Sequence, residues 1–153
     1  MNDILIASDH GGFALKEKLK PYLQKCGFTS RDLGTHSKER CDYPQFAASL
    51  AGEISRRRYE RGILICKSGI GVSIVANRFS GVRAALVDNI KAARLSRQHN
   101  DSNVLVMGAG FVKSALAKRI VRTWLETKFQ GGRHKKRLDQ IKKIEKDIKR
   151  WKV

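Results

Sequence analysis

The sequence predicts an α/β protein, namely a three-layer α/β/α Rossmann-like domain with a five-stranded parallel sheet and an extra C-terminal helix. Apolar runs of strand length alternate along the chain with amphipathic stretches of helical spacing, which is typical of a parallel sheet covered by helices. The runs are almost continuously apolar, as expected of strands buried on both faces. Ligands of such folds bind beyond the carboxyl ends of the strands, so the residues that follow each strand are candidates for function.

Five apolar runs are predicted as strands: residues 4–8, 28–33, 62–66, 82–87 and 104–107. Between them, apolar residues three and four apart predict amphipathic helices. These helices are expected over residues 13–26, 43–58, 70–77, 90–97 and 112–127. Gly27 is a plausible stop for the first of them.

The chain divides into an α/β domain, residues 1–130, and a basic C-terminal helix of the same domain, residues 131–153. This last helix has a narrow apolar stripe, made of Leu138, Ile141, Ile144, Ile148 and Trp151. A helix with so narrow a stripe has few core partners within its own domain. We expect it to lie over its own domain or to pack on a partner subunit.

Length and composition are those of one folded domain of 153 residues, 41% of them hydrophobic. We expect no signal peptide and no membrane span, because no basic leader and no long apolar run is present. The three cysteines are odd in number and form no CxxC pair, which argues against a disulfide framework and against a zinc site. The simplest location is the cytoplasm.

The formal net charge of +18 favours anionic partners, such as phosphorylated metabolites, nucleic acid or acidic membranes. The excess is not confined to the tail, since residues 131–153 account for only +7 of it. Weak, salt-sensitive binding to nucleic acid is expected of any such surface. Aromatic residues make up 7% and no recognised nucleic-acid motif is present, so a nucleic-acid-binding protein is the alternative from another class.

Two polar motifs follow predicted strands. After the first strand comes Asp9-His10-Gly11-Gly12, where Asp9 and His10 would project into the crevice and glycine lets the backbone approach a ligand. Asp9 could instead cap the next helix. After the third strand comes Cys66-Lys67-Ser68-Gly69-Ile70-Gly71.

Cys66 stands where backbone N–H groups at the start of a helix stabilise an anion. We expect its pKa to lie below the free value of about 8.5, which makes Cys66 a candidate base at neutral pH. The motif matches neither the GxxxxGK[ST] nor the GxGxxG pattern. The alternative is a small buried cysteine before an ordinary turn.

Two further groups are candidates. His99 lies in a polar run expected to follow the fourth helix, where it would be either a solvent-facing loop residue or a working acid/base. Arg133 and Arg137 share one face of the last helix and could grip a phosphate through paired hydrogen bonds. The alternative for both arginines is a solvated basic helix.

Taken together, these pieces resemble the ribose-5-phosphate isomerase B family, which also includes galactose-6-phosphate isomerase subunits. The likeness runs from Ile4 to about Ile144. Its landmarks are Ser8-Asp9-His10-Gly11-Gly12, Asp32-Leu33-Gly34-Thr35, Asp42-Tyr43-Pro44, Gly62-Ile63-Leu64-Ile65-Cys66, Ser68-Gly69-Ile70-Gly71, Leu95-Ser96-Arg97-Gln98-His99-Asn100-Asp101, Asn103-Val104-Leu105 and Gly131-Gly132-Arg133-His134.

The resemblance implies an enzyme without metal or other cofactor that interconverts ribose 5-phosphate and ribulose 5-phosphate through a cis-enediolate, in the non-oxidative pentose phosphate pathway. Cys66 would move the proton between the two carbons, helped by the backbone N–H groups of residues 67–71 and by the Ser68 hydroxyl. His99 would open the furanose ring with Asp9 nearby. The sugar and its phosphate would be held by Asn100, Tyr43, His10, Arg133 and Arg137.

The resemblance further implies a homodimer or tetramer whose active sites are shared between subunits, with His99 and Asn100 supplied by the neighbour of the chain that carries Cys66. Lys67 and Gly110 depart from the pattern, because the family usually has Gly at position 67 and often Arg at position 110. We expect Lys67 or Lys113 to supply a substitute cation. The alternative within enzymes is an isomerase of a six-carbon sugar phosphate, allose 6-phosphate or galactose 6-phosphate. Retention of the His99-Asn100 pair favours a pentose phosphate.

Overall fold

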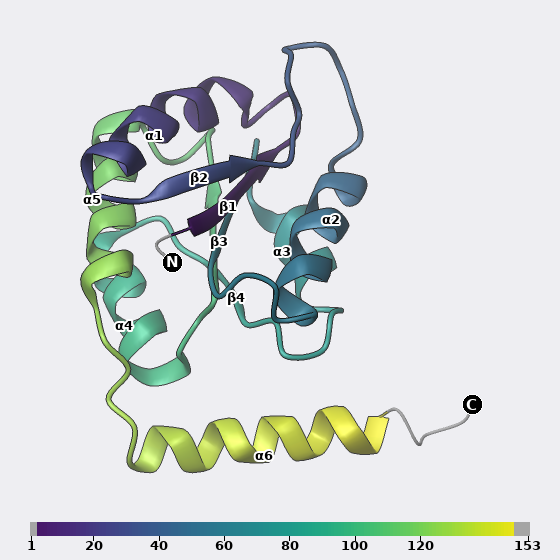
Figure 1. Cartoon of the computed structure of the whole chain (residues 1–153), viewed down its shortest axis with the longest axis vertical. Helices are drawn as coiled ribbons and strands as arrows, with labels where there is room; N and C mark the ends of the chain where they lie inside the picture. The colour runs from purple at the N-terminus through teal and green to yellow at the C-terminus, as the bar shows by residue number, and fades with distance from the viewer. Residues whose placement is uncertain (1–2, 149–153) are drawn as a thin grey trace.

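The computed structural model describes residues 3–148 and confirms the three-layer α/β/α fold. Within these residues the sheet has five parallel strands in the order β2-β1-β3-β5-β4 (Figure 1). The strands are β1 (Asp3–Ser8), β2 (Thr29–Asp32), β3 (Gly62–Cys66), β4 (Ala84–Leu86) and β5 (Val104–Gly108). All residues of β3 and β5 are buried, as are those of β1 beyond Asp3. The continuous apolar runs of the sequence therefore mark the centre of the sheet.

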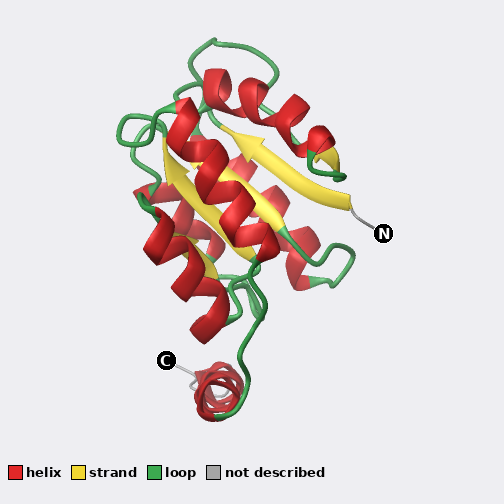
Figure 2. Ribbon diagram, turned by 90° about the vertical axis from the view of Figure 1, so that its left-hand side faces the viewer, coloured by secondary structure: helices red, strands yellow, loops and turns green. Residues whose placement is uncertain are grey.

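Helices cover both faces of this sheet, as Figure 2 shows from the side of α1, α4 and α5. The helices are α1 (Phe13–Lys25), α2 (Tyr43–Ser55), α3 (Ile70–Ala76), α4 (Ile90–Asn100), α5 (Ser114–Glu126) and α6 (Arg133–Ile148). Alternate residues of the central strands point to opposite faces. Ile63 and Ile65 of β3 pack against α1, α4 and α5, whereas Leu64 and Cys66 face α2 and α3.

Several predicted boundaries were wrong, and three of them have a clear physical reason. The fourth helix continues beyond residue 97, so His99 and Asn100 lie in the last turn of α4, and the left-handed Asp101 ends it. The second helix stops at Ser55, shortly before Arg57 takes a left-handed conformation with φ of 58°. The fourth strand is short because Val82 still belongs to the turn after α3, where its N–H donates to the Phe79 carbonyl at 3.1 Å.

The C-terminal helix α6 lies apart from the two helical layers, at the bottom of Figure 1. Leu138 is buried, and Glu145 accepts hydrogen bonds from the N–H of Gly81, just before β4. The exposed fractions of Ile141, Ile144 and Ile148 are 44%, 54% and 52%. The predicted apolar stripe is thus only partly covered by its own domain, and Trp151 lies outside the described residues.

A buried ion pair ties α1 to the end of β2. The Lys16 side chain has no solvent exposure, and its ammonium donates to Asp32 Oδ1 at 2.6 Å. Lys20 donates to the same carboxylate at 2.9 Å, and so does the N–H of Gly34. Burial raises the pKa of Asp32, but the hydrogen bonds from Lys16, Lys20 and Gly34 outweigh it and hold the pKa below its usual value. This carboxylate therefore fixes the loop that follows β2.

We expect Lys16→Met to lower the free energy of unfolding at pH 7 by about 3 kcal/mol, because it leaves a partly buried carboxylate without its main partner. The measurement is urea unfolding, with Lys18→Met on the exposed face of α1 as the control, expected within about 0.5 kcal/mol of wild type. Because the pKa of Asp32 is lowered by folding, the contribution of this carboxylate is present at neutral pH and is lost as the pH falls below about 4. A loss no larger than that of the control would contradict this account of the pair.

Candidate active site

The strand order of the sheet reverses between β1 and β3. From β1 the chain passes to β2 on one side, and β3 then pairs with β1 on the other side, with Ser8 in register with Ile65. Such a reversal opens a crevice at the carboxyl ends of the two strands. The two polar motifs predicted from the sequence, residues 9–12 and residues 66–71, therefore lie side by side there.

Glycine is required where the two motifs touch. A Cβ on Gly12 would lie 2.5 Å from the Ile65 carbonyl oxygen, and one on Gly11 would lie 3.2 Å from the Lys67 nitrogen. Asp9 is buried beside them and accepts a hydrogen bond from the N–H of Gly12 at 3.1 Å. The N-cap residue of α1 is Gly12, so Asp9 serves the start of this helix from three residues earlier. Its carboxylate lies beside Gly11, where an added Cβ would be 3.3 Å from Asp9 Oδ1.

The Cys66 thiol ends β3 and is almost fully buried. The N–H of Gly69 donates to Cys66 Sγ at 3.0 Å, and Gly69 reaches this position with a left-handed φ of 78°. The Ser68 hydroxyl lies in the same turn, where it accepts from the N–H of Ile70 at 3.2 Å. The turn therefore sets a backbone hydrogen-bond donor against the sulfur at the start of α3.

Tyr43 and His10 form the walls beside this turn. A Cβ on Gly71 would lie 2.5 Å from Tyr43 Cζ, so the phenol ring covers the start of α3. The exposed His10 lies against Cys41, whose N–H is 3.2 Å and whose Sγ is 3.9 Å from His10 Nδ1. Sequence reasoning assigned no role to Cys41, since nothing in its local pattern indicates a contact with a residue 31 positions earlier.

Lys67 reaches across the neighbouring loop after β5. The N–H of Gly110 donates to the Lys67 carbonyl at 2.8 Å, and a Cβ on Gly110 would lie 3.4 Å from Lys67 Cε. The Lys67 side chain thus covers the position where a side chain of residue 110 would begin. Its ammonium is exposed and has no ion-pair partner within residues 3–148. Lys113 is the residue that precedes the first turn of α5.

The remaining predicted residues lie at the opposite end of the sheet, where the strands begin. The C-terminal end of α4, which carries His99 and Asn100, is bonded to residues that precede the strands: Arg83 Nε donates to the Asn100 carbonyl at 3.0 Å. Because β3 begins at this end of the sheet and stops at Cys66, the structure does not bring His99 and Cys66 together within one chain. Arg133 and Arg137 of α6 lie at the same end of the sheet as His99, and these residues form a second group of candidates.

His134 joins this second group. Its ring stacks on the ring of His99, with centroids 4.1 Å apart and planes 11° apart, and its side chain is buried. Burial, together with the positive charges of His99, Arg133 and Arg137, lowers the pKa of His134. Sequence reasoning missed this residue. The signal was its position four residues before Leu138, which extends the apolar stripe of α6 by one turn.

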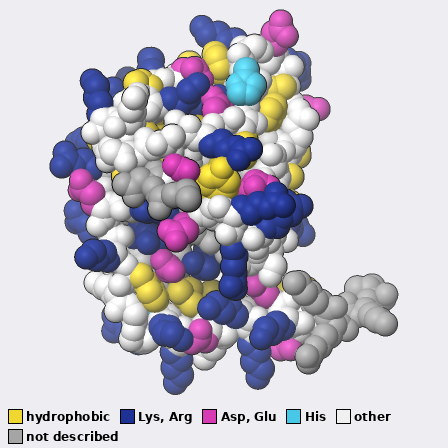
Figure 3. All heavy atoms as spheres, viewed as in Figure 1, with side chains coloured by type: hydrophobic (Ala, Val, Ile, Leu, Met, Phe, Trp, Pro, Cys, Tyr) yellow, Lys and Arg dark blue, Asp and Glu magenta, His cyan; other side chains and the backbone are white. Residues whose placement is uncertain are grey.

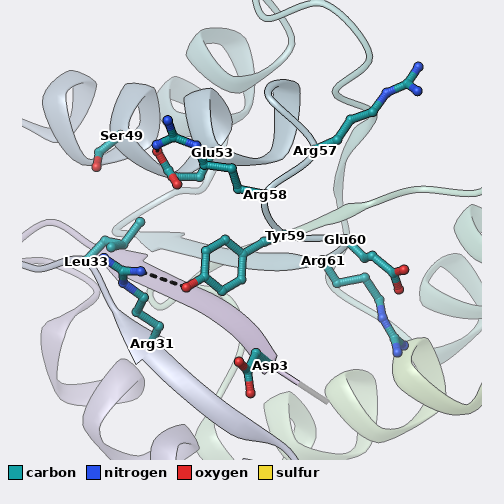
Figure 4. Close-up of a pocket in the computed structure, with 10 residues that line it drawn as sticks. All are labelled: Asp3, Arg31, Leu33, Ser49, Glu53, Arg57, Arg58, Tyr59, Glu60 and Arg61. Atoms are coloured by element: carbon teal, nitrogen blue, oxygen red, sulfur yellow. Dashed lines mark hydrogen bonds and ion pairs between the residues drawn. The ribbon is translucent and has the colours of Figure 1, made fainter. Parts of the chain in front are cut away.

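Two surface hollows lie away from Cys66. One, of about 740 Å³, opens near the amino ends of β1 and β3 and is drawn in Figure 4, where Arg31 points to the Tyr59 hydroxyl. Its lining residues are Asp3, Arg31, Leu33, Ser49, Glu53, Arg57, Arg58, Tyr59, Glu60 and Arg61. The other, of about 1270 Å³, lies between α6 and the rest of the domain. Neither contains a residue of the crevice.

In the part of the chain that the structure describes, no three His, Cys, Asp or Glu side chains gather as a metal site would require. None of the described helices is both long and apolar enough to cross a membrane.

A family model described as Ribose/Galactose Isomerase matches residues 4–141. The chain belongs to the ribose/galactose isomerase family. Ribose-5-phosphate isomerase B of Escherichia coli (strain K12) is 44% identical over 145 residues, which are 95% of this chain and 97% of that protein. The probable ribose-5-phosphate isomerase B of Mycoplasma genitalium is 41% identical over 147 residues, or 95% and 97% of the two chains.

Solved structures of this isomerase family have the same fold. Ribose-5-phosphate isomerase B of Clostridium thermocellum superposes with a TM-score of 0.93 at 46% identity, covering 95% of this chain and 99% of its own. The Mycoplasma genitalium enzyme with bound ribulose-5-phosphate gives a TM-score of 0.91 at 41% identity, covering 94% and 96%. The resemblance drawn from the sequence landmarks is thereby confirmed at the level of family and fold.

Proposed function

We propose that the chain is an aldose–ketose isomerase that interconverts ribose 5-phosphate and ribulose 5-phosphate, with Cys66 as the base. The observation that carries this proposal is the buried Cys66 thiol, bonded to the N–H of Gly69 at 3.0 Å, directly after Ile65, which is in register with Ser8 before Asp9. Support comes from the relatives named ribose-5-phosphate isomerase B, one of them solved with ribulose-5-phosphate. We assign the reaction to the non-oxidative pentose phosphate pathway and to the cytoplasm.

The reaction moves one proton between neighbouring carbons. Cys66 as thiolate takes the proton from C2 of the open-chain aldose, and the C–H electron pair forms a C1–C2 double bond while the carbonyl oxygen becomes negative. Within residues 67–71, the backbone N–H groups that are not bonded to Cys66 Sγ or Ser68 Oγ hold the enediolate oxygens, and the Ser68 hydroxyl assists. The thiol then returns the proton to C1, while the proton of the C2 hydroxyl passes to the C1 oxygen, so that C2 becomes the carbonyl of the ketose. No external oxidant or reductant is consumed.

The other predicted residues serve ring opening and binding. In ribofuranose 5-phosphate the C1–O4 bond must break before C2 can be deprotonated, and this step needs one group to take a proton and one to give it. His99 and Asp9 are proposed as that pair, with Asn100 on a sugar oxygen and Tyr43 along the sugar. His10, Arg133 and Arg137 would bind the phosphate, joined by the exposed Lys67.

A second copy of the chain is proposed to complete each site. Cys66 and His99 lie at opposite ends of the strands of one sheet, so the two side chains of a single chain cannot both contact one sugar. Large apolar side chains are exposed near the Cys66 turn, with exposed fractions of 53% for Ile70, 54% for Ile74 and 70% for Phe111. A twofold pairing would cover them and would create two equivalent sites. The uncovered apolar stripe of α6 would pack on the partner chain in the same assembly, which is a homodimer or a tetramer.

Two other functions are the alternatives that the experiments below distinguish from this proposal. A six-carbon sugar phosphate would fit the same chemistry, since the family description names both ribose and galactose isomerases. Specific nucleic-acid binding has weaker support, because Lys and Arg are spread over the face in Figure 3 among Asp and Glu side chains instead of forming one basic stripe. Turnover of the purified single chain on each sugar phosphate separates these possibilities.

The first experiment measures conversion of ribose 5-phosphate to ribulose 5-phosphate in EDTA. We expect robust turnover by the wild type and a fall of about 10³-fold in kcat for Cys66→Ala, because removing a general base costs 10²–10⁴-fold. Cys26→Ala, at the end of α1, is the control and should retain wild-type turnover. A folded wild type inactive on the pentose would direct the search to six-carbon sugar phosphates, whereas an active Cys66→Ala would remove Cys66 as the base.

Sharing of sites is tested by mixing two inactive variants, Cys66→Ala and His99→Ala. If each site takes Cys66 from one chain and His99 from another, mixed dimers regain one intact site, and a random mixture should reach about a quarter of wild-type activity. The control is each variant incubated alone under the same exchange conditions. A mixture that stays inactive, although mass spectrometry shows that chains have exchanged, would mean that both residues act within one chain or that sharing is absent.

Lys67 is expected to act on the substrate phosphate. Lys67→Ala should raise KM for ribose 5-phosphate about tenfold, equivalent to about 1.4 kcal/mol, with little change in kcat, since it removes a cation that binds ground state and transition state alike. Lys113→Ala is the comparison that tells which lysine supplies the charge. An unchanged KM in Lys67→Ala would exclude this role for Lys67.

A further inference from the structure

The orientation of His99 depends on a contact from outside its own helix. Its ring lies in the last turn of α4 and stacks face to face on His134 of α6, with centroids 4.1 Å and planes 11° apart. The connection between the helices is fixed at the same point, because the N–H of Gln130 donates to the Gln98 carbonyl at 3.1 Å. A backbone hydrogen bond and a ring stack therefore hold the start of α6 against the residues around His99.

His134 is itself well anchored. Its exposed fraction is 5%, and Leu138, one turn further along α6, is buried with an exposed fraction of 8%. The N–H of His134 donates to the Gly131 carbonyl at 3.0 Å, which closes the first turn of the helix. By contrast, the neighbouring Arg133 and Arg137 are exposed. A buried ring on an anchored turn can restrict the partly buried ring on which it stacks.

We propose that His134 is the positioning residue for His99: by stacking on one face of the His99 ring, it sets the angle at which that ring exchanges protons with the sugar during ring opening. This inference rests on the function proposed above. Ring opening breaks the C1–O4 bond, takes the proton of the anomeric hydroxyl and delivers a proton to O4. A misdirected imidazole would slow this step while leaving the later transfer by Cys66 intact.

The charge state of the pair supports the same assignment. Burial lowers the pKa of His134, and His99 from α4 with Arg133 and Arg137 from α6 lower it further. His134 therefore stays neutral at pH values where an ordinary histidine begins to take up a proton, and there it adds no positive charge beside His99. Protonation of His134 in acid would place a second cation against His99 and weaken the stack.

The test compares two readouts that differ in their need for ring opening. Ribose 5-phosphate exists mainly as a furanose, whereas ribulose 5-phosphate is acyclic because its C5 oxygen carries the phosphate. The first readout is turnover of ribose 5-phosphate. The second is exchange of the C1 proton of ribulose 5-phosphate for deuterium in D₂O, which passes through the enediolate at Cys66 without any ring chemistry.

For His134→Ala we expect turnover of ribose 5-phosphate to fall between about tenfold and a hundredfold, with C1 exchange within about twofold of wild type. His134→Phe keeps a flat ring and should restore turnover to within about threefold of wild type, because stacking and not proton transfer is the role assigned to this residue. At pH values well below the ordinary histidine pKa of about 6.5, turnover by His134→Phe should decline less steeply than that of the wild type, since phenylalanine cannot take up a proton. Lys135→Ala, on the exposed side of α6, is the control and should match the wild type.

Three outcomes would overturn the proposal: an equal fall of both readouts in His134→Ala, which indicates general damage to the fold; no fall in either; or a His134→Phe enzyme as slow as His134→Ala. Failure of the function proposed above is recognised separately. In that case the wild type itself performs neither turnover nor exchange, or performs both without Cys66.

Discussion

The fold and the candidate site both depend on how closely the chain after β1 approaches the chain after β3. Gly12 lies so near the Ile65 carbonyl that a Cβ would stand 2.5 Å from its oxygen, and Gly11 meets Lys67 in the same way. The parallel pairing of β1 with β3, buried between two helical layers, brings these two segments together. Asp9 and Cys66 then lie on neighbouring segments, each directly at the end of its strand, without needing a long loop to carry either of them. The buried pair of Lys16 and Asp32 also fixes the loop after β2 against β1. Asp32 accepts a hydrogen bond from the N–H of Gly34, and the Gly34 carbonyl accepts one from the N–H of Ser8, one residue before Asp9.

Much of this arrangement was predictable from local patterns. Continuous apolar runs predicted the central strands, and glycine-rich polar motifs directly after two of them predicted the crevice. Prediction from local sequence patterns failed where the surroundings of a residue are set by distant parts of the chain. Residues 97–101 are polar throughout and carry no local signal that α4 continues to Asn100. The burial of His134 depends on His99, 35 positions away, and the burial of Lys16 depends on Asp32. Hydrophobic periodicity cannot reveal a polar side chain that is buried by a specific partner.

The two groups of candidate residues differ in their surroundings. At the end of β3, a backbone N–H donates to one almost fully buried sulfur, and electrostatic interactions are strong in such a setting. At the other end of the sheet, arginine side chains on α6 are exposed around one buried imidazole, so their attraction for a phosphate extends into solvent and is weakened by salt. The net charge of +18 adds to this long-range attraction. The basic surface is therefore compatible with capture of small anions without a dedicated nucleic-acid stripe.

The placement of Cys66 and His99 at opposite ends of one sheet has a consequence for how activity responds to dilution. If every working site is assembled from two chains, a lone chain contributes nothing, and the number of sites follows the association equilibrium instead of the amount of protein. Far below the dissociation constant of the dimer, total activity would rise with the square of chain concentration. Near saturation it would become linear. Ribose 5-phosphate that bridges two chains would itself shift this equilibrium, so the substrate would help to assemble the enzyme that consumes it.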